Sequence, residues 1–303
     1  MKPFTHILYI FAAAVLFTAC NSDVPKHADS LGKGNINISV DETYTPIIKE
    51  QLKVFDSSFP EAHVNAAFKA EGECFKDFMN NKVPLILVTR DLDSNEREVL
   101  KGQKAVPTSL AIAKDAVAVV VNNASRDTFS VSEIRGILTG TYSKKYTVVF
   151  DDQNSSTVRF MLDSIIPGEK LGANVFAAKG NDSVIKYVAN NPDAIGFVGV
   201  SYVSDYNDPE EMAFISSVKV AALLNEETRK YYKPYQAFIA QRLYPLTRNL
   251  FYIHRETHFG LGTGFANFLA QERGQLIFKQ ARLFPLRSNI IIREAAVNPE
   301  PQN

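Results

Sequence analysis

The stretch Tyr146-Thr-Val-Val-Phe-Asp-Asp-Gln-Asn-Ser-Ser-Thr-Val-Arg-Phe-Met-Leu-Asp-Ser-Ile-Ile166 places a strand, a polar turn and a helix in direct succession. The apolar, β-branched run 146–150 predicts a short strand. After the turn, apolar residues recur at the i, i+3, i+4 and i+7 spacing of one helix face: Val158, Met161, Leu162 and Ile165. This order predicts an α/β unit whose polar turn opens a helix.

The polar turn has the composition of an anion site. The first N–H groups of a helix have no partner within it, and the helix dipole adds positive potential there. Hydroxyls of Ser155, Ser156 and Thr157 could add donors to such a site. An ordinary capped loop has the same features, so the local pattern leaves both interpretations open.

Length and composition indicate an ordinary globular protein. The 303 residues suffice for two lobes, and 46% are hydrophobic against 22% charged. The formal net charge is zero, so nothing in the charge balance points to a nucleic-acid partner.

The N-terminus has the pattern of a secretory signal over residues 1–20. Lys2 precedes an apolar run at 7–17 that is too short to span a membrane. Leu16-Phe-Thr-Ala-Cys20 resembles a bacterial lipobox, so we expect lipidation at Cys20 and a membrane anchor through that lipid. The expected location is the cell envelope, and the sequence does not decide between the inner membrane, the outer membrane and the cell surface.

Two polar segments are expected to flank the folded part. Residues 21–34 read as a flexible tether and 298–303 as a disordered tail. Cys74 is then without a disulfide partner and, among aromatic neighbours, is expected in the core.

Between these segments, strands alternate with helices, which predicts an α/β fold with largely parallel sheets. Strands are expected at 35–40, 64–70, 84–89, 116–121, 146–150, 194–200, 218–224, 250–254 and 289–293. Helices are expected from Pro46, at 73–80, after the capping box Ser130-Val-Ser-Glu133 up to Gly140, after Thr157, at 182–189, and at 265–280 with a potential break at Gly274.

Several segments, in this order, resemble the periplasmic phosphate-binding proteins of ABC importers. They are Ile38-Ser-Val-Asp-Glu-Thr-Tyr-Thr-Pro46, Ile86-Leu-Val-Thr-Arg-Asp-Leu92, 106–122, Phe129–Gly140, Asn154-Ser-Ser-Thr-Val-Arg-Phe160, Ala194-Ile-Gly-Phe-Val-Gly199, Tyr244-Pro-Leu-Thr-Arg248 and 268–275. Each match is weak alone, but their order and spacing are specific together.

The resemblance implies a type II periplasmic-binding-protein fold with a ligand cleft between two α/β lobes. Lobe 1 would comprise residues 35–117 and 245–297, and lobe 2 residues 118–244. It also implies a monomeric binding protein that works by lobe closure and delivers its solute to a membrane permease.

The resemblance assigns candidate ligand-binding residues in both lobes. The implied donors are Thr43, Tyr44, Thr89, Ser155, Ser156 and Thr157, with Arg90 or Arg159 as the charge partner. The sequence departs from the family in its charges. Asp151 stands where the family has an arginine, and Glu42, Glu71 and Glu73 could also bring negative charge to the cleft.

Three functions therefore stay open. The first is a solute-binding lipoprotein for phosphate or a related oxyanion. The second keeps the fold but binds a cationic, zwitterionic or neutral solute through Asp151, Glu71 and Glu73. The third is an envelope interaction protein without a small-molecule ligand.

Enzymatic motifs are incomplete, so we expect no catalytic residue, metal or cofactor. His254 and His258 lack the glutamate that follows the first histidine of a metalloprotease helix. The segment 91–95 lacks the glycine and the bidentate acid of a calcium loop. Gly260-Leu-Gly-Thr-Gly264 lacks the setting of a dinucleotide site, and Ser155 has no identifiable histidine base.

Overall fold

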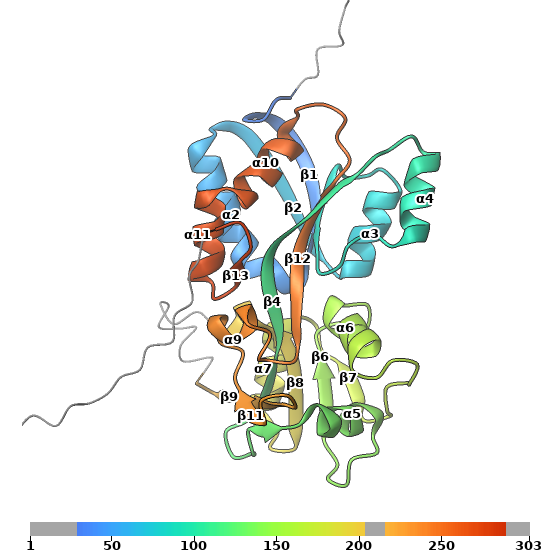
Figure 1. Ribbon diagram of the computed structural model, residues 1–303, viewed down its shortest axis with the longest axis vertical. Coiled ribbons are helices and arrows are strands. Elements are labelled where there is room, and N and C mark those ends of the chain that lie inside the picture. Colours follow the sequence, from blue (N-terminus) through green and yellow to red (C-terminus); the bar gives the residue numbers. More distant parts are fainter. Residues whose placement is uncertain (1–28, 204–215, 289–303) are drawn as a thin grey trace, which may run out of the picture.

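The computed structural model describes residues 29–203 and 216–288, which form two α/β lobes stacked along the long axis of the molecule (Figure 1). One sheet extends through both lobes in the order β2-β1-β3-β12-β4-β8-β6-β7, and β9 and β13 also pair with β4. Its strands are β1 (Lys33–Asp41), β2 (Glu61–Lys69), β3 (Leu85–Val88), β4 (Thr108–Asn122), β6 (Thr147–Phe150), β7 (Val175–Ala177), β8 (Ala194–Gly199), β9 (Val218–Val220), β12 (Thr247–His254) and β13 (Phe284–Pro285).

The long strand β4 joins the lobes. Through Ala116 it pairs antiparallel with β12, and from Val117 onward it pairs with β8. Figure 1 shows β4 and β12 running side by side from the upper lobe into the lower one. The paired strand changes between these two adjacent residues, which marks the boundary between the lobes.

Helices cover both faces of the lobe 1 sheet. The reason is visible in β3, whose successive apolar side chains point alternately to the two faces. Leu85 and Leu87 face the larger core, whereas Ile86 and Val88 face a second core with Phe78 of α3. A strand that is apolar at every position is buried on both faces. The helices of this lobe are α2 (Thr45–Ser58), α3 (Glu71–Met79), α4 (Ser94–Gly102), α10 (Leu261–Ala270) and α11 (Glu272–Gln280).

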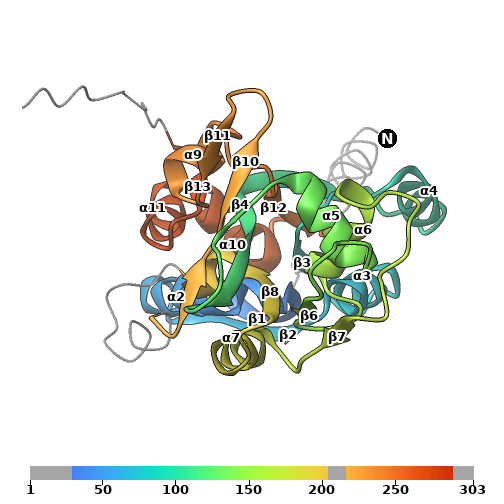
Figure 2. The same cartoon turned by 90° about the horizontal axis from the view of Figure 1, so that it is seen from below.

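Lobe 2 is built on β6, which is parallel to both β7 and β8. Figure 2 shows α6 and α7 on opposite sides of these strands. Gly196 lets α7 pack closely, because a Cβ at this position would lie 2.6 Å from Val184. The helices here are α5 (Val131–Thr139), α6 (Ser156–Ser164), α7 (Asn181–Asn190) and α9 (Gln236–Ala240), and β5 (Thr128–Phe129), β10 (Ala222–Asn225) and β11 (Lys230–Tyr232) form a small second sheet.

The local signals for α5 were read correctly. Ser130 and Glu133 form the expected reciprocal capping box. Gly140 ends the helix with a φ of 77°, a left-handed conformation that favours glycine.

One helix was missed, and three expectations need correction. Helix α4 was not predicted, although Asp93 and Glu96 form a capping box in the segment tested as a calcium loop. The expected strand 218–224 is two strands, β9 and β10. The expected helix 265–280 begins at Leu261 and breaks at Gln271, because Gln271 is extended there. The expected tether 21–34 is too long, since Lys33 already belongs to β1.

Several predicted features lie outside the described residues. They are the signal 1–20 with Cys20, most of the tether, the strand 289–293 and the tail 298–303. Within the described ranges, no helix is long and apolar enough to cross a membrane.

Candidate functional site

Three helix starts meet where the lobes face each other. In lobe 1, β1 leads into the short helix η1 (Glu42–Tyr44) and then α2; in lobe 2, β6 leads into α6. These starts touch, because Thr43 Oγ1 lies 3.2 Å from Ser156 Oγ. The start of α3 is close as well, since a Cβ at Gly72 would lie 3.9 Å from the carbonyl oxygen of Asn154. Convergent helix N-termini beyond strand ends are a favourable place for an anion.

Side chains that directly precede these helices cap their N-termini. Asp41 Oδ1 accepts the N–H of Thr43 at 3.0 Å and caps η1. Ser155 Oγ accepts the N–H of Val158 at 3.3 Å and caps α6. Ser155, expected as a ligand donor, is therefore engaged as a helix cap.

The two lobes are closed directly on each other. Thr43, Ser156 and Thr157 have no solvent-accessible surface. A cavity beside them that could hold a water molecule would make part of their surface accessible. Ser201 Oγ and Tyr202 Oη of lobe 2 donate to the carbonyl oxygens of Thr43 and Glu42, at 3.2 and 2.9 Å. A solute must therefore enter with the lobes apart.

Glycine at the end of β8 permits this close approach. A Cβ at Gly199 would lie 2.3 Å from Cγ2 of Thr43 in the opposite lobe. Any larger residue here would push the two helix starts apart.

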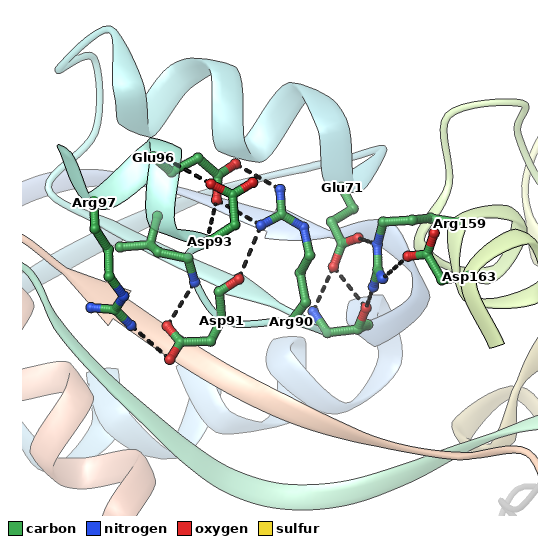
Figure 3. Close-up of polar contacts among 10 residues, drawn as sticks. Glu71, Arg90, Asp91, Asp93, Glu96, Arg97, Arg159 and Asp163 are labelled. Carbon is green, nitrogen blue, oxygen red and sulfur yellow. Dashed lines mark hydrogen bonds and ion pairs between the residues drawn. The ribbon is translucent and has the colours of Figure 1, made fainter. Parts of the chain in front are cut away.

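Glu71 connects the lobes through its carboxylate (Figure 3). Its Oε1 accepts the N–H and the hydroxyl of Thr89, both at 2.7 Å. Its Oε2 accepts Nε of Arg159 on α6 at 2.5 Å. Both predicted groups, Thr89 and Arg159, thus meet at Glu71, which the sequence had marked as a departure from the family and as a candidate contact for a non-anionic solute.

Arg248 is a site residue that the sequence reasoning missed. Its Nε donates to Asp115 Oδ2 at 2.8 Å and its Nη1 to Ser156 Oγ at 3.1 Å. Its Nη2 is buried without a hydrogen-bond partner. Arg248 also lies over the ring of Tyr44, 5.9 Å from its centroid, and the Tyr44 hydroxyl is likewise buried without a partner.

A sequence signal for this pair exists. Arg248 alternates with Leu250 and Tyr252 along β12, and Asp115 interrupts the apolar run of β4. The two charges are direct partners in the β4–β12 register. Neither strand alone reveals that pairing.

Several carboxyl groups near the helix starts have raised pKa values. Burial, followed by the charge of Glu71, raises the pKa of Asp41 to about 7. Burial, followed by Asp151 and Asp152, raises the pKa of the half-buried Glu42 to about 7. Burial also raises the pKa of Asp151, whose Oδ2 accepts the amide of Asn181 at 3.3 Å.

Acidic groups therefore outnumber basic ones around these helix starts. The buried carboxyl groups are Asp41, Glu71, Asp115 and Asp151. Facing them are the buried Arg248 and the partly exposed Arg159. An anion that enters here brings further negative charge, so its binding should be accompanied by proton uptake.

Two residues predicted to lie at the ligand site, Arg90 and Glu73, point away from the lobe boundary. The guanidinium of Arg90 pairs with both carboxylate oxygens of Glu96 at 2.7 Å and lies 3.6 Å from the ring centroid of Phe75. In Figure 3 it turns toward α4, away from Arg159. Glu73 is exposed and lies 3.5 Å from Lys76 on its own helix. Arg159, rather than Arg90, is thus the arginine at the lobe boundary.

The two histidines considered as a metal motif, His254 and His258, occupy structural positions. His254 is buried at the end of β12, and His258 Nε2 lies 2.9 Å from Asp29. The glycines at 260–264 form the start of α10, where Glu256 accepts the N–H groups of Gly262 and Thr263. In residues 29–203 and 216–288, no group of three or more potential metal ligands is found.

Two α/β lobes, joined by long strands and meeting at helix starts, define the type II periplasmic-binding-protein fold. Residues 25–273 match the sequence family described as a PBP superfamily domain, and the chain belongs to that family. The fold and the family resemblance expected from the sequence are both confirmed.

Known relatives and solved structures agree with this assignment. The phosphate-binding protein PstS of Pseudomonas aeruginosa is 21% identical over 96% of this chain and 95% of its own. PstS of Bacillus subtilis is 24% identical over 61% of this chain and 63% of its own. A Clostridium perfringens structure, described as a phosphate ABC transporter substrate-binding protein with bound phosphate, has a TM-score of 0.69 at 19% identity, over 84% of this chain and 100% of that one.

Proposed function

We propose that this chain is an extracytoplasmic solute-binding protein that binds phosphate between its lobes for an ABC importer. One observation carries the proposal: the hydroxyls of Thr43 and Ser156, at helix starts of opposite lobes, lie 3.2 Å apart in a buried site, where Ser156 also accepts from Arg248. The neighbouring Thr157 adds a buried hydroxyl that has no hydrogen-bond partner among the described residues. Hydroxyls, helix N–H groups and guanidinium groups are the donors that bind tetrahedral oxyanions. Relatives described as phosphate-binding proteins support the same solute.

Lobe closure is the mechanism in this proposal, and no bond is made or broken. A solute favours the closed state by as much as it binds that state more tightly than the open one. β4 and β12 connect the lobes, so the separation that admits a solute would occur about these strands. A permease would then recognise the closed form.

Replacing Thr157 by valine is expected to weaken phosphate binding by about 10- to 100-fold, because a hydrogen bond to a charged acceptor contributes about 1.5–3 kcal/mol. The hydroxyl is buried and has no hydrogen-bond partner within the described part of the protein, so the same change should leave the protein at least as stable. Calorimetric titration in phosphate-free buffer, after unfolding and refolding to remove carried solute, measures the effect.

Thr157→Ser is the matched control, because it keeps the hydroxyl and should retain most of the affinity. Equal phosphate affinity in the valine variant would remove Thr157 from the site. An absence of heat and of thermal shift with the unmodified protein at millimolar phosphate would refute phosphate as the solute.

The envelope location in this proposal depends on Cys20, which follows an apolar run and small residues. Expressed in bacteria fed labelled palmitate, the protein is expected to carry the label, and Cys20→Ser should lose it. A labelled Cys20→Ser protein would contradict an anchor at this residue.

A further inference from the structure

The carboxylate of Glu71 is held as a bound oxyanion would be held. Glu71 is the first residue of α3 and is 1% exposed. A backbone N–H, a hydroxyl and a guanidinium N–H donate to its two oxygens, all within 2.7 Å. These are the same kinds of donor that the proposed phosphate site offers.

The donors come from both lobes. Thr89 follows β3 in lobe 1, while Arg159 projects from α6 in lobe 2 (Figure 3). Arg159 Nη2 also donates to Thr89 Oγ1 at 2.6 Å, so the guanidinium binds the opposite lobe at two points. The Thr89 hydroxyl has one proton and gives it to Glu71, so it has none for a solute in this arrangement.

We propose that Glu71 is a tethered anion that holds the lobes together without solute and competes with a solute oxyanion for Arg159 and Thr89. The competition rests on the proposed function, whereas the contact between lobes does not. The affinity for the solute then depends on how much more favourably Arg159 and Thr89 bind the free oxyanion than they bind the carboxylate of Glu71.

Glu71→Gln tests the proposal, because the amide is nearly the same size, has no charge and can itself donate to an oxyanion. Glu73→Gln is the matched control: it removes the same charge from the same helix, at an exposed position paired with Lys76. Small-angle scattering and amide hydrogen exchange at the first turn of α6 measure lobe closure without solute. Calorimetry with inorganic phosphate measures affinity.

Solute-free Glu71→Gln is expected to be more expanded and to exchange faster at α6 than the unmodified protein, and phosphate should reverse both changes. Its dissociation constant for phosphate should be at least about tenfold lower, because a like charge near the solute is gone. Glu73→Gln should match the unmodified protein in all measurements.

Arg159→Gln provides a second, independent variant. It should open the solute-free lobes as Glu71→Gln does, without a gain in phosphate affinity. The double variant should be no more open than either single variant, because both remove one shared contact.

Unchanged dimensions and exchange in both single variants would overturn the tethered anion. So would an opened Glu71→Gln whose phosphate affinity equals that of the unmodified protein. If the variants open but none of the proteins binds phosphate, the proposed solute fails while the role of Glu71 in holding the lobes together is supported.

Discussion

Arg248→Met is expected to lower the free energy of unfolding by about 3–5 kcal/mol and to abolish phosphate binding. Removing one partner of a buried ion pair leaves the other charge without compensation, which accounts for that range. Here the remaining charge is Asp115, which is fully buried and whose Oδ1 already lacks a partner. Urea unfolding followed by optical spectroscopy measures stability, and calorimetry with phosphate measures binding.

Two controls separate folding from binding. Arg97 pairs with Asp91 at 2.7 Å on the surface, so Arg97→Met should change stability by no more than about 1 kcal/mol. The double variant Asp115→Leu with Arg248→Met removes both buried charges and should recover much of the lost stability, yet still fail to bind phosphate. Recovery of binding in that double variant would show that Arg248 acts on stability alone.

The second large effect concerns pH. Asp41 has an ordinary pKa of 3.8 and a folded-state pKa of about 7, so the folded protein keeps a proton that the unfolded chain releases. The stability that this proton confers is complete below pH 4 and is lost as the pH rises to about 7. A shift of this size corresponds to at most about 4 kcal/mol. Glu42, with its pKa also raised to about 7, adds in the same direction.

Other groups oppose this trend. Burial lowers the pKa of His254 below its ordinary value of 6.5, so the contribution of its neutral form to stability grows as the pH rises to about 6.5, although the larger shifts of Asp41 and Glu42 outweigh it.

Carboxyl groups with lowered pKa values oppose the trend in more acidic solution. Hydrogen bonds from Lys69 and Ser39, against the opposing effect of burial, lower the pKa of Asp77. Burial raises the pKa of Glu133, but hydrogen bonds and the ion pair with Arg126 outweigh it, so that the pKa of this carboxyl is also lowered. Their stabilisation is lost as the pH falls below about 4. The free energy of unfolding should therefore be greatest near pH 4–5 and decline toward neutrality.

Asp41→Asn is expected to remove most of that decline and to stabilise the protein at pH 8 by about 2–4 kcal/mol, because no charge is buried. Urea unfolding between pH 4 and 8 measures it. Asp56→Asn, an exposed change on α2, should follow the profile of the unmodified protein. An Asp41→Asn profile as steep as the original would exclude Asp41 as its source.

Features set by neighbouring residues could be predicted from the sequence. The capping box at Ser130, the left-handed Gly140 and the strand–turn–helix around Ser156 depend on residues a few positions apart. The order of the family's segments added the two-lobe fold, which no local pattern contains.

Features set by tertiary contacts could not be predicted. Whether Arg90 or Arg159 serves the site depends on Glu96, which lies on a helix absent from the prediction and binds Arg90. Arg248 finds Asp115 only through the register of two strands that are far apart in the sequence. The role of Glu71 likewise requires a partner from the other lobe.

The place of β12 in the sheet has a consequence for the order of assembly. It lies between β3 and β4, and it comes from residues 247–254, well after both of them in the sequence. Until this segment is available, β3 and the first half of β4 each present an unpaired edge toward the same gap. The strands that continue the sheet through lobe 2 all precede it. Lobe 1 is thus completed by a segment that leaves the ribosome after those strands of lobe 2.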